Sequence, residues 1–215
     1  MAKRTIHYRC EQCGKLHMAQ VYEGVDVAKE PQFRSRVMDA SIFDFACPDC
    51  GYVNGIIYPF VYHDPDRRFL IRLIDQTVTG DPFTSLFDTE EETDAAIKGV
   101  VEDMKQRYRF RAVRTPNDLM EKIAIFEAGY DDRVIELMKI FLLSSRNDSS
   151  ILHLYFAPTD DGPVFLMEIE AGFTGSIPLE ETLYDSIAAK TQEAMNPADT
   201  EIDSLWASKF FDRMN

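Results

Sequence analysis

The sequence predicts an α+β protein of two domains, with a zinc-ribbon-like domain over residues 1–78, a linker over 79–88 and an acidic α+β domain over 89–215. Three observations support this prediction. All four cysteines lie in two Cys-x-x-Cys pairs within the first 50 residues. Charge is divided unevenly, because residues 1–80 hold 10 basic and 10 acidic residues whereas the remainder carries the net charge of −14. Helical periodicity dominates from residue 97 and changes to strand alternation near residue 150.

The four cysteines, Cys10, Cys13, Cys47 and Cys50, have the spacing of two zinc knuckles. Each knuckle is a tight turn that presents two thiolates, and a glycine follows each pair (Gly14 in the first), where the turn requires a positive φ. Four thiolates form a closed tetrahedral shell without an open position for substrate, so the pattern predicts a structural Zn²⁺. A redox dithiol and a pair of disulfides are the alternatives. A redox protein needs only one such pair, and the flanking residues lack a long βαβ pattern.

The knuckles are separated by 33 residues, more than the roughly 15–20 of simple four-cysteine sites. Strands are expected on both sides of each knuckle, over 5–9, 18–27, 42–46 and 55–62, and a further strand over 69–74. A short helix is expected from Pro31 to Asp39, with Phe33 and Val37 on one face. An inserted strand and this helix account for the long interval, which predicts a zinc ribbon with an insertion between its two knuckles.

The two knuckles at this separation, the phrase Phe45-Ala46-Cys47-Pro48-Asp49-Cys50-Gly51 and the following Tyr62-His63-Asp64-Pro65 resemble the CpXC-domain proteins. The resemblance covers about the first third of the chain. Similar proteins continue with segments like those at residues 108–111 and 121–123. The first knuckle differs in having Glu11 in place of proline, which is not a metal ligand. The resemblance implies the zinc-ribbon-like fold and leaves the activity open.

The second domain is expected to contain helices packed against a small antiparallel sheet. A capping box of Thr89 and Glu92 starts a helix that reaches Tyr108, where an extended segment begins. Further helices are expected over 115–129, 131–142, 180–195 and 200–210, and Thr115 caps the first of these. Strands over 151–156 and 165–169 form a hairpin with one apolar face.

Several other residues are candidates for chemistry or recognition. The predicted hairpin register sets His153 opposite Glu168, with Glu170 two residues along, which is either an acid–base or metal site or a surface charge pair. His17 could replace a cysteine ligand. His63 and Asp64 have the residue types of an oriented base, but neighbours in a strand point to opposite faces, so a turn at Asp64 is favoured.

Two motifs could bind partners. Phe83, Leu86 and Phe87 have the spacing of a segment that docks in a hydrophobic groove, although packing on the second domain of the same chain is favoured. The arginines of the segment after residue 104 could contact phosphate or an acidic protein, although internal ion pairs are favoured. They are Arg107, Arg109, Arg111 and Arg114.

We therefore expect a cytoplasmic protein that acts as a non-catalytic interaction module with a protein partner. The N-terminal residues lack the apolar core of a signal peptide, and no apolar run is long enough to span a membrane. The alternatives are an enzyme that uses His153 and Glu168, or nucleic-acid binding by the ribbon. The acidic net charge disfavours nucleic acid, because binding depends on neutralising phosphates.

Overall fold

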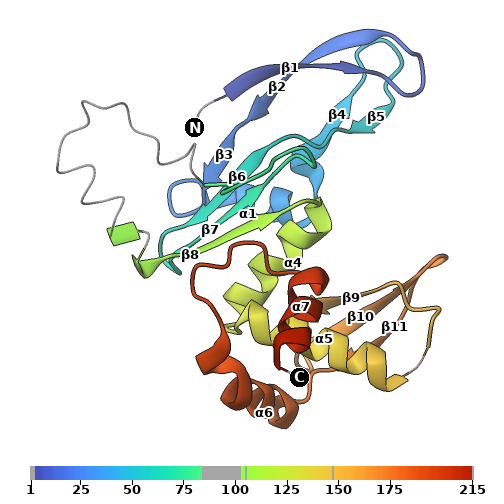
Figure 1. Ribbon diagram of the computed structural model, residues 1–215. Helices are drawn as coiled ribbons and strands as arrows, with labels where there is room; N and C mark the ends of the chain where they lie inside the picture. Colours follow the sequence, from blue (N-terminus) through green and yellow to red (C-terminus); the bar gives the residue numbers. More distant parts are fainter. Residues whose placement is uncertain (1–2, 84–102, 105, 147, 215) are drawn as a thin grey trace. The chain divides into compact units, whose positions relative to one another are not determined.

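A computed structural model describes residues 3–83, 103–104, 106–146 and 148–214 (Figure 1). The chain divides into two compact units, Met1–Met120 and Glu121–Asn215, and the division falls within helix α4 (Pro116–Glu127). The domain limits expected from the sequence stay a prediction, as does the helix capped by Thr89, because residues 84–102 lie outside the described residues. The architecture is a mixture of small sheets and helices, so the α+β class is confirmed.

Two antiparallel strand pairs of the first unit carry the knuckles. Strands β1 (Lys3–Arg9) and β2 (Leu16–Tyr22) flank the first knuckle, and β4 (Asp44–Ala46) and β5 (Val53–Gly55) flank the second. Both turns end in a glycine with positive φ, +71° at Gly14 and +75° at Gly51, which non-glycine residues rarely adopt. The interval between the knuckles contains β3 (Gly24–Asp26) and α1 (Gln32–Met38), so the predicted insertion is present.

A four-stranded sheet forms the core of the first unit. Its order is β3-β6-β7-β8, with β6 (Phe60–Asp64), β7 (Phe69–Leu73) and β8 (Arg109–Val113). The central pair is antiparallel and both outer pairs are parallel. Strand β8 confirms the extended segment expected after Tyr108, and it pairs with β7 of the first unit although the sequence suggested the acidic domain.

The second unit contains the predicted hairpin and one further strand. Strands β9 (His153–Ala157) and β10 (Val164–Ile169) pair with the expected register, which sets Phe156 opposite Phe165. Strand β11 (Gly172–Pro178) extends the sheet on the other side of β10 and was not predicted. A Cβ at Gly175 would lie 3.0 Å from Cε at the flexible end of Met167, its cross-strand partner on β10.

Helices α5 (Asp132–Arg146), α6 (Glu181–Thr191) and α7 (Ser204–Met214) complete this unit. Helices α4 and α5 confirm the predicted helices, and the Thr115 hydroxyl accepts the N–H of Asp118 as expected of a cap. Helix α6 ends before a short 3₁₀ turn (Gln192–Ala194), so the helix expected to Met195 is too long. Helix α7 begins at Ser204, after Asp203, which accepts the N–H of Trp206, so the helix expected from residue 200 starts later than predicted.

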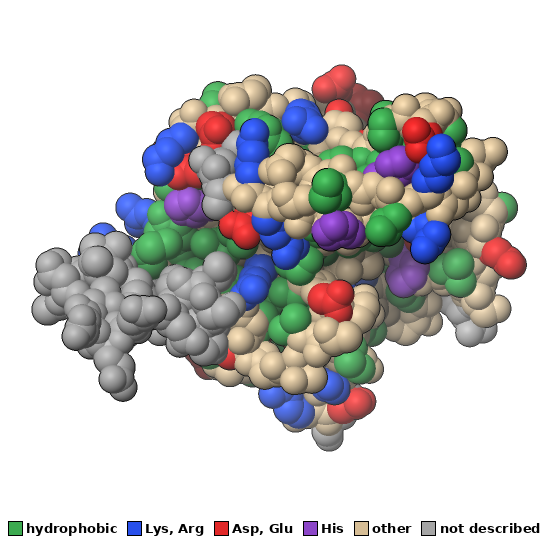
Figure 2. Space-filling model, turned by 90° about the horizontal axis from the view of Figure 1, so that it is seen from above, with side chains coloured by type: hydrophobic (Ala, Val, Ile, Leu, Met, Phe, Trp, Pro, Cys, Tyr) green, Lys and Arg blue, Asp and Glu red, His purple; other side chains and the backbone are tan. Residues whose placement is uncertain are grey.

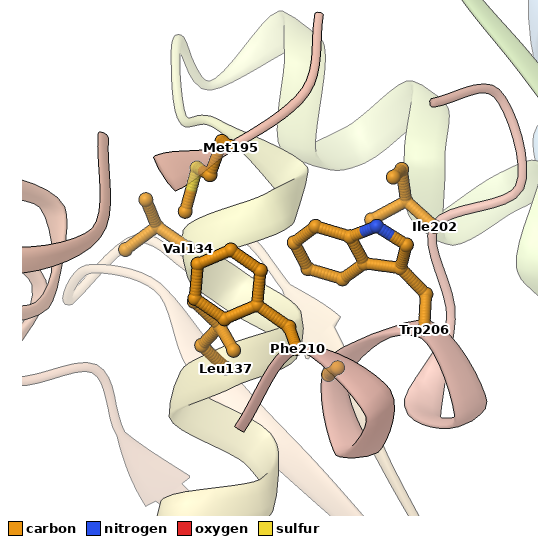
Figure 3. Packing of buried hydrophobic residues seen from close by; sticks show 7 residues of the cluster. Val134, Leu137, Met195, Ile202, Trp206 and Phe210 are labelled. Atoms are coloured by element: carbon orange, nitrogen blue, oxygen red, sulfur yellow. The ribbon is translucent and has the colours of Figure 1, made fainter. Parts of the chain in front are cut away.

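One hydrophobic cluster joins α5, α7 and the segment before α7 (Figure 3). The rings of Trp206 and Phe210 stack with centroids 5.3 Å apart, and Trp206 donates from its indole N–H to Asp199. The other members are aliphatic side chains and one methionine: Val134, Leu137, Met195, Ile202 and Ala207. The single tryptophan therefore reports on the second unit.

Among the described residues, no helix combines the length and the apolar character that crossing a bilayer requires.

Candidate metal centre

The two Cys-x-x-Cys turns have the same backbone hydrogen bonds. In the first, the N–H of Cys10 donates to Lys15 O and the N–H of Gly14 donates to Cys10 O, both at 2.9 Å. In the second, Cys47 and Gly51 donate in the same way to Tyr52 O and Cys47 O, at 2.8 and 2.9 Å. The equivalent turns aim two thiols each at a common point, although 33 residues separate them in the sequence.

The four thiol sulfurs all lie within 4.8 Å of one another. Cys10 Sγ is 3.6 Å from Cys50 Sγ, and Cys13 Sγ is 3.7 Å from Cys47 Sγ. A tetrahedral ion with Zn–S bonds of about 2.3 Å would place its sulfurs about 3.8 Å apart. A disulfide requires about 2.05 Å, and all four cysteines are free. The cluster therefore has the chemistry and the spacing to hold a metal ion such as zinc.

Close packing of the four thiols affects their acidity. Burial alone would raise the pKa of Cys10, but the backbone N–H groups of Cys13 and Gln12 donate to its sulfur, and its pKa is lowered to about 6. The N–H of Tyr52 lowers the pKa of Cys50, but burial and the neighbouring thiols outweigh it and raise the pKa to about 12. The Cys10 thiol therefore ionises readily whereas the Cys50 thiol resists ionisation, because adjacent thiolates repel each other. A divalent cation would remove this repulsion.

Asn54 connects the two knuckles from a buried position on β5, with 3% of its surface exposed. Its Oδ1 accepts the N–H of Glu11 at 2.9 Å, in the first knuckle. Its Nδ2 donates to Tyr52 O at 3.2 Å and Phe45 O at 3.4 Å, which flank the second knuckle, and lies 3.7 Å from Cys10 Sγ. The sequence analysis missed this residue, because only the pairing of β5 with β4 brings it between the turns.

His17 lies beside the cluster. Its Nε2 is 3.3 Å from Cys47 Sγ and 3.6 Å from Asp49 Oδ2, and Asp49 also pairs with Lys15 at 3.1 Å. An imidazole in this position can donate a hydrogen bond to a thiolate and reduce its charge. The group of side chains positioned to hold an ion consists of the four cysteines, and His17 lies beside it, within hydrogen-bonding reach of the Cys47 sulfur.

The model of the CpXC protein family matches residues 8–139, which is more than half of the chain. The chain belongs to the CpXC family. The match includes all four cysteines, Asn54 and His17, and it extends well beyond the first third of the chain on which the resemblance rested. Comparison with curated proteins and with solved structures finds no match.

His153 and Glu168 face each other across β9 and β10, as the register predicted. His153 is exposed, Glu168 is half-buried, and Glu170 lies exposed just after β10. Within the described ranges, the four cysteines are the one group of three or more cysteine, histidine or carboxylate side chains positioned to hold a metal ion. The hairpin pair therefore has the exposure of a surface charge pair.

The other candidate residues contact their own chain. Asp64 accepts hydrogen bonds from the backbone and the guanidinium of Arg67, both at 3.0 Å, which confirms the turn after β6. Phe83 is buried against Leu70, Ile74 and Ala112, all of the first unit, so the packing on the second domain that the sequence favoured is wrong for this residue. Its predicted companions Leu86 and Phe87 lie outside the described residues.

The basic segment also contacts its own chain, and the internal ion pairing that the sequence favoured is present at Arg107. Arg107 forms an ion pair with Asp103 at 2.7 Å. Arg111 is buried and donates to the carbonyl of Phe110, and Arg114 donates to the carbonyl of Asp75. Arg109 lies half-buried in β8, where it pairs with Phe69 of β7.

A buried charge network in the second unit was also missed by the sequence analysis. Lys139 contacts Glu121 at 2.7 Å and Glu136 at 3.0 Å, and Lys122 contacts Glu136 at 2.9 Å and Asp132 at 3.3 Å. Glu121 also accepts the N–H of Phe156 on β9. Burial raises the pKa of Glu121, whereas the two lysines outweigh burial and lower the pKa of Glu136. The network joins α4, α5 and β9 through paired charges.

Proposed function

We propose that this CpXC protein is a structural zinc protein in which the metal fixes a surface that recognises another protein. One observation carries the proposal: four sulfurs with tetrahedral spacing form a complete ligand set, so a bound ion would have no position left for substrate. Cys10, Cys13, Cys47 and Cys50 would be the ligands. Such an ion supplies cross-linking between the knuckles rather than Lewis-acid chemistry.

The surroundings of the cluster support a structural role. Asn54 Nδ2 and His17 Nε2 lie within hydrogen-bonding reach of the two buried sulfurs, those of Cys10 and Cys47. Hydrogen bonds to a thiolate reduce its charge and its nucleophilicity, which suits a permanent ligand. The catalytic alternative has less support, because His153 and its carboxylate neighbours lie on an accessible sheet surface without a nucleophile or a set of oxyanion donors beside them in the described chain.

Affinity purification of the zinc-loaded full chain, followed by mass spectrometry, tests the proposal. We expect a partner protein that is retained by the wild type and lost after Cys10→Ser, because loss of one ligand opens the site and loosens both knuckles. His153→Gln is the matched control, and it should retain the partner. Recovery of no partner, or a partner retained equally by metal-free Cys10→Ser, contradicts the proposal. Loss of the partner with His153→Gln would instead indicate that the hairpin in the second unit is functional.

A further inference from the structure

The outward-facing side of the β1–β2 hairpin, here called the hairpin outer face, has an unusual composition. Alternate residues of a strand share one face, and the cross-strand register pairs those on β1 with those on β2. The face consists of Lys3, Thr5, His7 and Arg9 from β1, with Tyr22, Gln20, Met18 and Leu16 opposite them on β2. Figure 2 shows the molecule from above, with apolar, basic, histidine and acidic side chains on the surface in view.

The apolar part of the hairpin outer face is a short continuous strip. Met18 and Leu16 are 70% and 63% exposed, more than any other large hydrophobic side chain described. They lie two residues apart on one strand, so their side chains are neighbours on the same surface. Single exposed apolar residues are ordinary, whereas two adjacent ones at this exposure form a small apolar strip that is available for contact.

The charged residues of the face have one sign. Lys3 and Arg9 are exposed, and the face contains no carboxylate, although the chain carries 37 acidic residues and a net charge of −14. Arg9 lies opposite Leu16 and His7 lies opposite Met18, so basic groups border the apolar strip. A complementary ligand therefore has apolar side chains with carboxylates beside them.

The face suits an acidic peptide better than a nucleic acid. Single-stranded nucleic acid binds to aromatic side chains on which bases stack, in a groove with many cations. The aromatic rings of this face are the imidazole of His7 and the phenol of Tyr22, which is half-buried and has the Lys3 ammonium 4.8 Å from its ring centroid. Thioether and aliphatic side chains such as Met18 instead adapt to the side chains of a peptide.

We propose that the hairpin outer face binds an acidic peptide segment with interspersed apolar side chains, supplied by another protein. This inference rests on the proposed function, for which it names the surface and the chemistry of the partner. The first knuckle is the turn of this hairpin, closed by the Cys10 N–H to Lys15 O hydrogen bond. The metal would therefore hold the two strands in the register that sets Arg9 beside Leu16.

Selection from a random 12-residue peptide phage library on the immobilised, zinc-loaded full chain tests the inference. We expect enrichment of peptides in which Asp or Glu flank Leu, Ile or Phe. The fluorescein-labelled winning peptide is then measured by fluorescence anisotropy. We expect at least tenfold weaker binding for the double variants His7→Glu/Arg9→Glu and Leu16→Ser/Met18→Ser.

Matched controls lie on α7 of the second unit, where Lys209 is exposed and Leu205 is 59% exposed. Lys209→Glu and Leu205→Ser make the same kinds of change, and they should bind within twofold of the wild type. Zinc content and circular dichroism of each variant establish that it is folded. Zinc content is the essential check for His7→Glu/Arg9→Glu, because the Arg9 guanidinium donates to the Gly14 carbonyl of the first knuckle at 2.6 Å.

Five outcomes overturn the inference. Four concern ligands: no enrichment, enriched peptides without acidic residues, equal binding by the face variants, and tight salt-dependent binding of a labelled 20-nucleotide oligothymidine that competes with the peptide. Self-association in sedimentation velocity that is lost in Leu16→Ser/Met18→Ser would assign the face to a second copy and also overturns it. Peptide binding that requires zinc but not the face leaves the proposed function intact. Binding of the peptide to the hairpin outer face of metal-stripped protein would contradict the structural role of zinc, but it would support the face as the binding surface.

Discussion

Replacing Asn54 by alanine removes the hydrogen bonds that join the two knuckles. The two shorter ones, from Glu11 N at 2.9 Å and to Tyr52 O at 3.2 Å, each contribute about 1 kcal/mol net. The longer contacts with Phe45 O and Cys10 Sγ add less individually. We expect a total loss of about 2–3 kcal/mol, which corresponds to about a 30- to 150-fold weaker retention of zinc.

Competition with a chromogenic zinc chelator measures this loss directly. Intrinsic fluorescence of Trp206 reports on the second unit and should be unchanged, because this side chain lies in the core of that unit. Asn54→Asp keeps the acceptor for Glu11 but places a negative charge near Cys10, so it should release zinc faster than Asn54→Ala. Exposed Asn117 on α4 provides the control, Asn117→Ala. Zinc retention within twofold of the wild type in Asn54→Ala would refute the reasoning.

Three further predictions concern stability. Burial lowers the pKa of His63 despite the opposing effect of Asp26, so the folded state disfavours the protonated ring. The free energy of unfolding should therefore fall as pH decreases below about 6.5, and it should fall less steeply in His63→Gln. Urea titrations in which both proteins lose the same stability at acid pH would contradict this. Lys139→Met leaves the buried Glu121 without its lysine and should lower the free energy of unfolding by about 3–5 kcal/mol, measured in urea by Trp206 fluorescence. The control Lys190→Met changes an exposed lysine and should have little effect. Equal stability of the two variants would show that the network is unimportant. Phe210→Ala opens a cavity beside Trp206 and should cost about 3–5 kcal/mol in the same assay, and a loss below 1 kcal/mol would contradict the packing in Figure 3.

Features set by local chemistry could be predicted from the sequence. Two Cys-x-x-Cys pairs followed by glycines suffice to predict two equivalent turns, since the ligand types and the positive φ at Gly14 and Gly51 are local requirements. The β9–β10 register follows from strict alternation, because a shift of one residue would expose Phe156 and Phe165.

Features that depend on distant contacts were not predictable in this way. Strand β8 pairs with β7 across 35 intervening residues, and nothing in its alternating basic and apolar sequence indicates that partner. Asn54 is one of several asparagines until β5 pairs with β4. Glu136 and Lys139 have the spacing of a solvated helix face, yet they are buried because Glu121 and Lys122 of α4 supply opposite charges.

Zinc K-edge X-ray absorption on the purified full chain tests the central claim most directly. The account predicts one zinc per chain with a first shell of four sulfurs at about 2.3 Å, and loss of one sulfur in Cys10→Ser. A first shell that contains nitrogen would make His17 a ligand and contradict the closed thiolate set. A folded chain that contains no metal, with its four thiols reduced or paired as disulfides, would contradict the claim altogether.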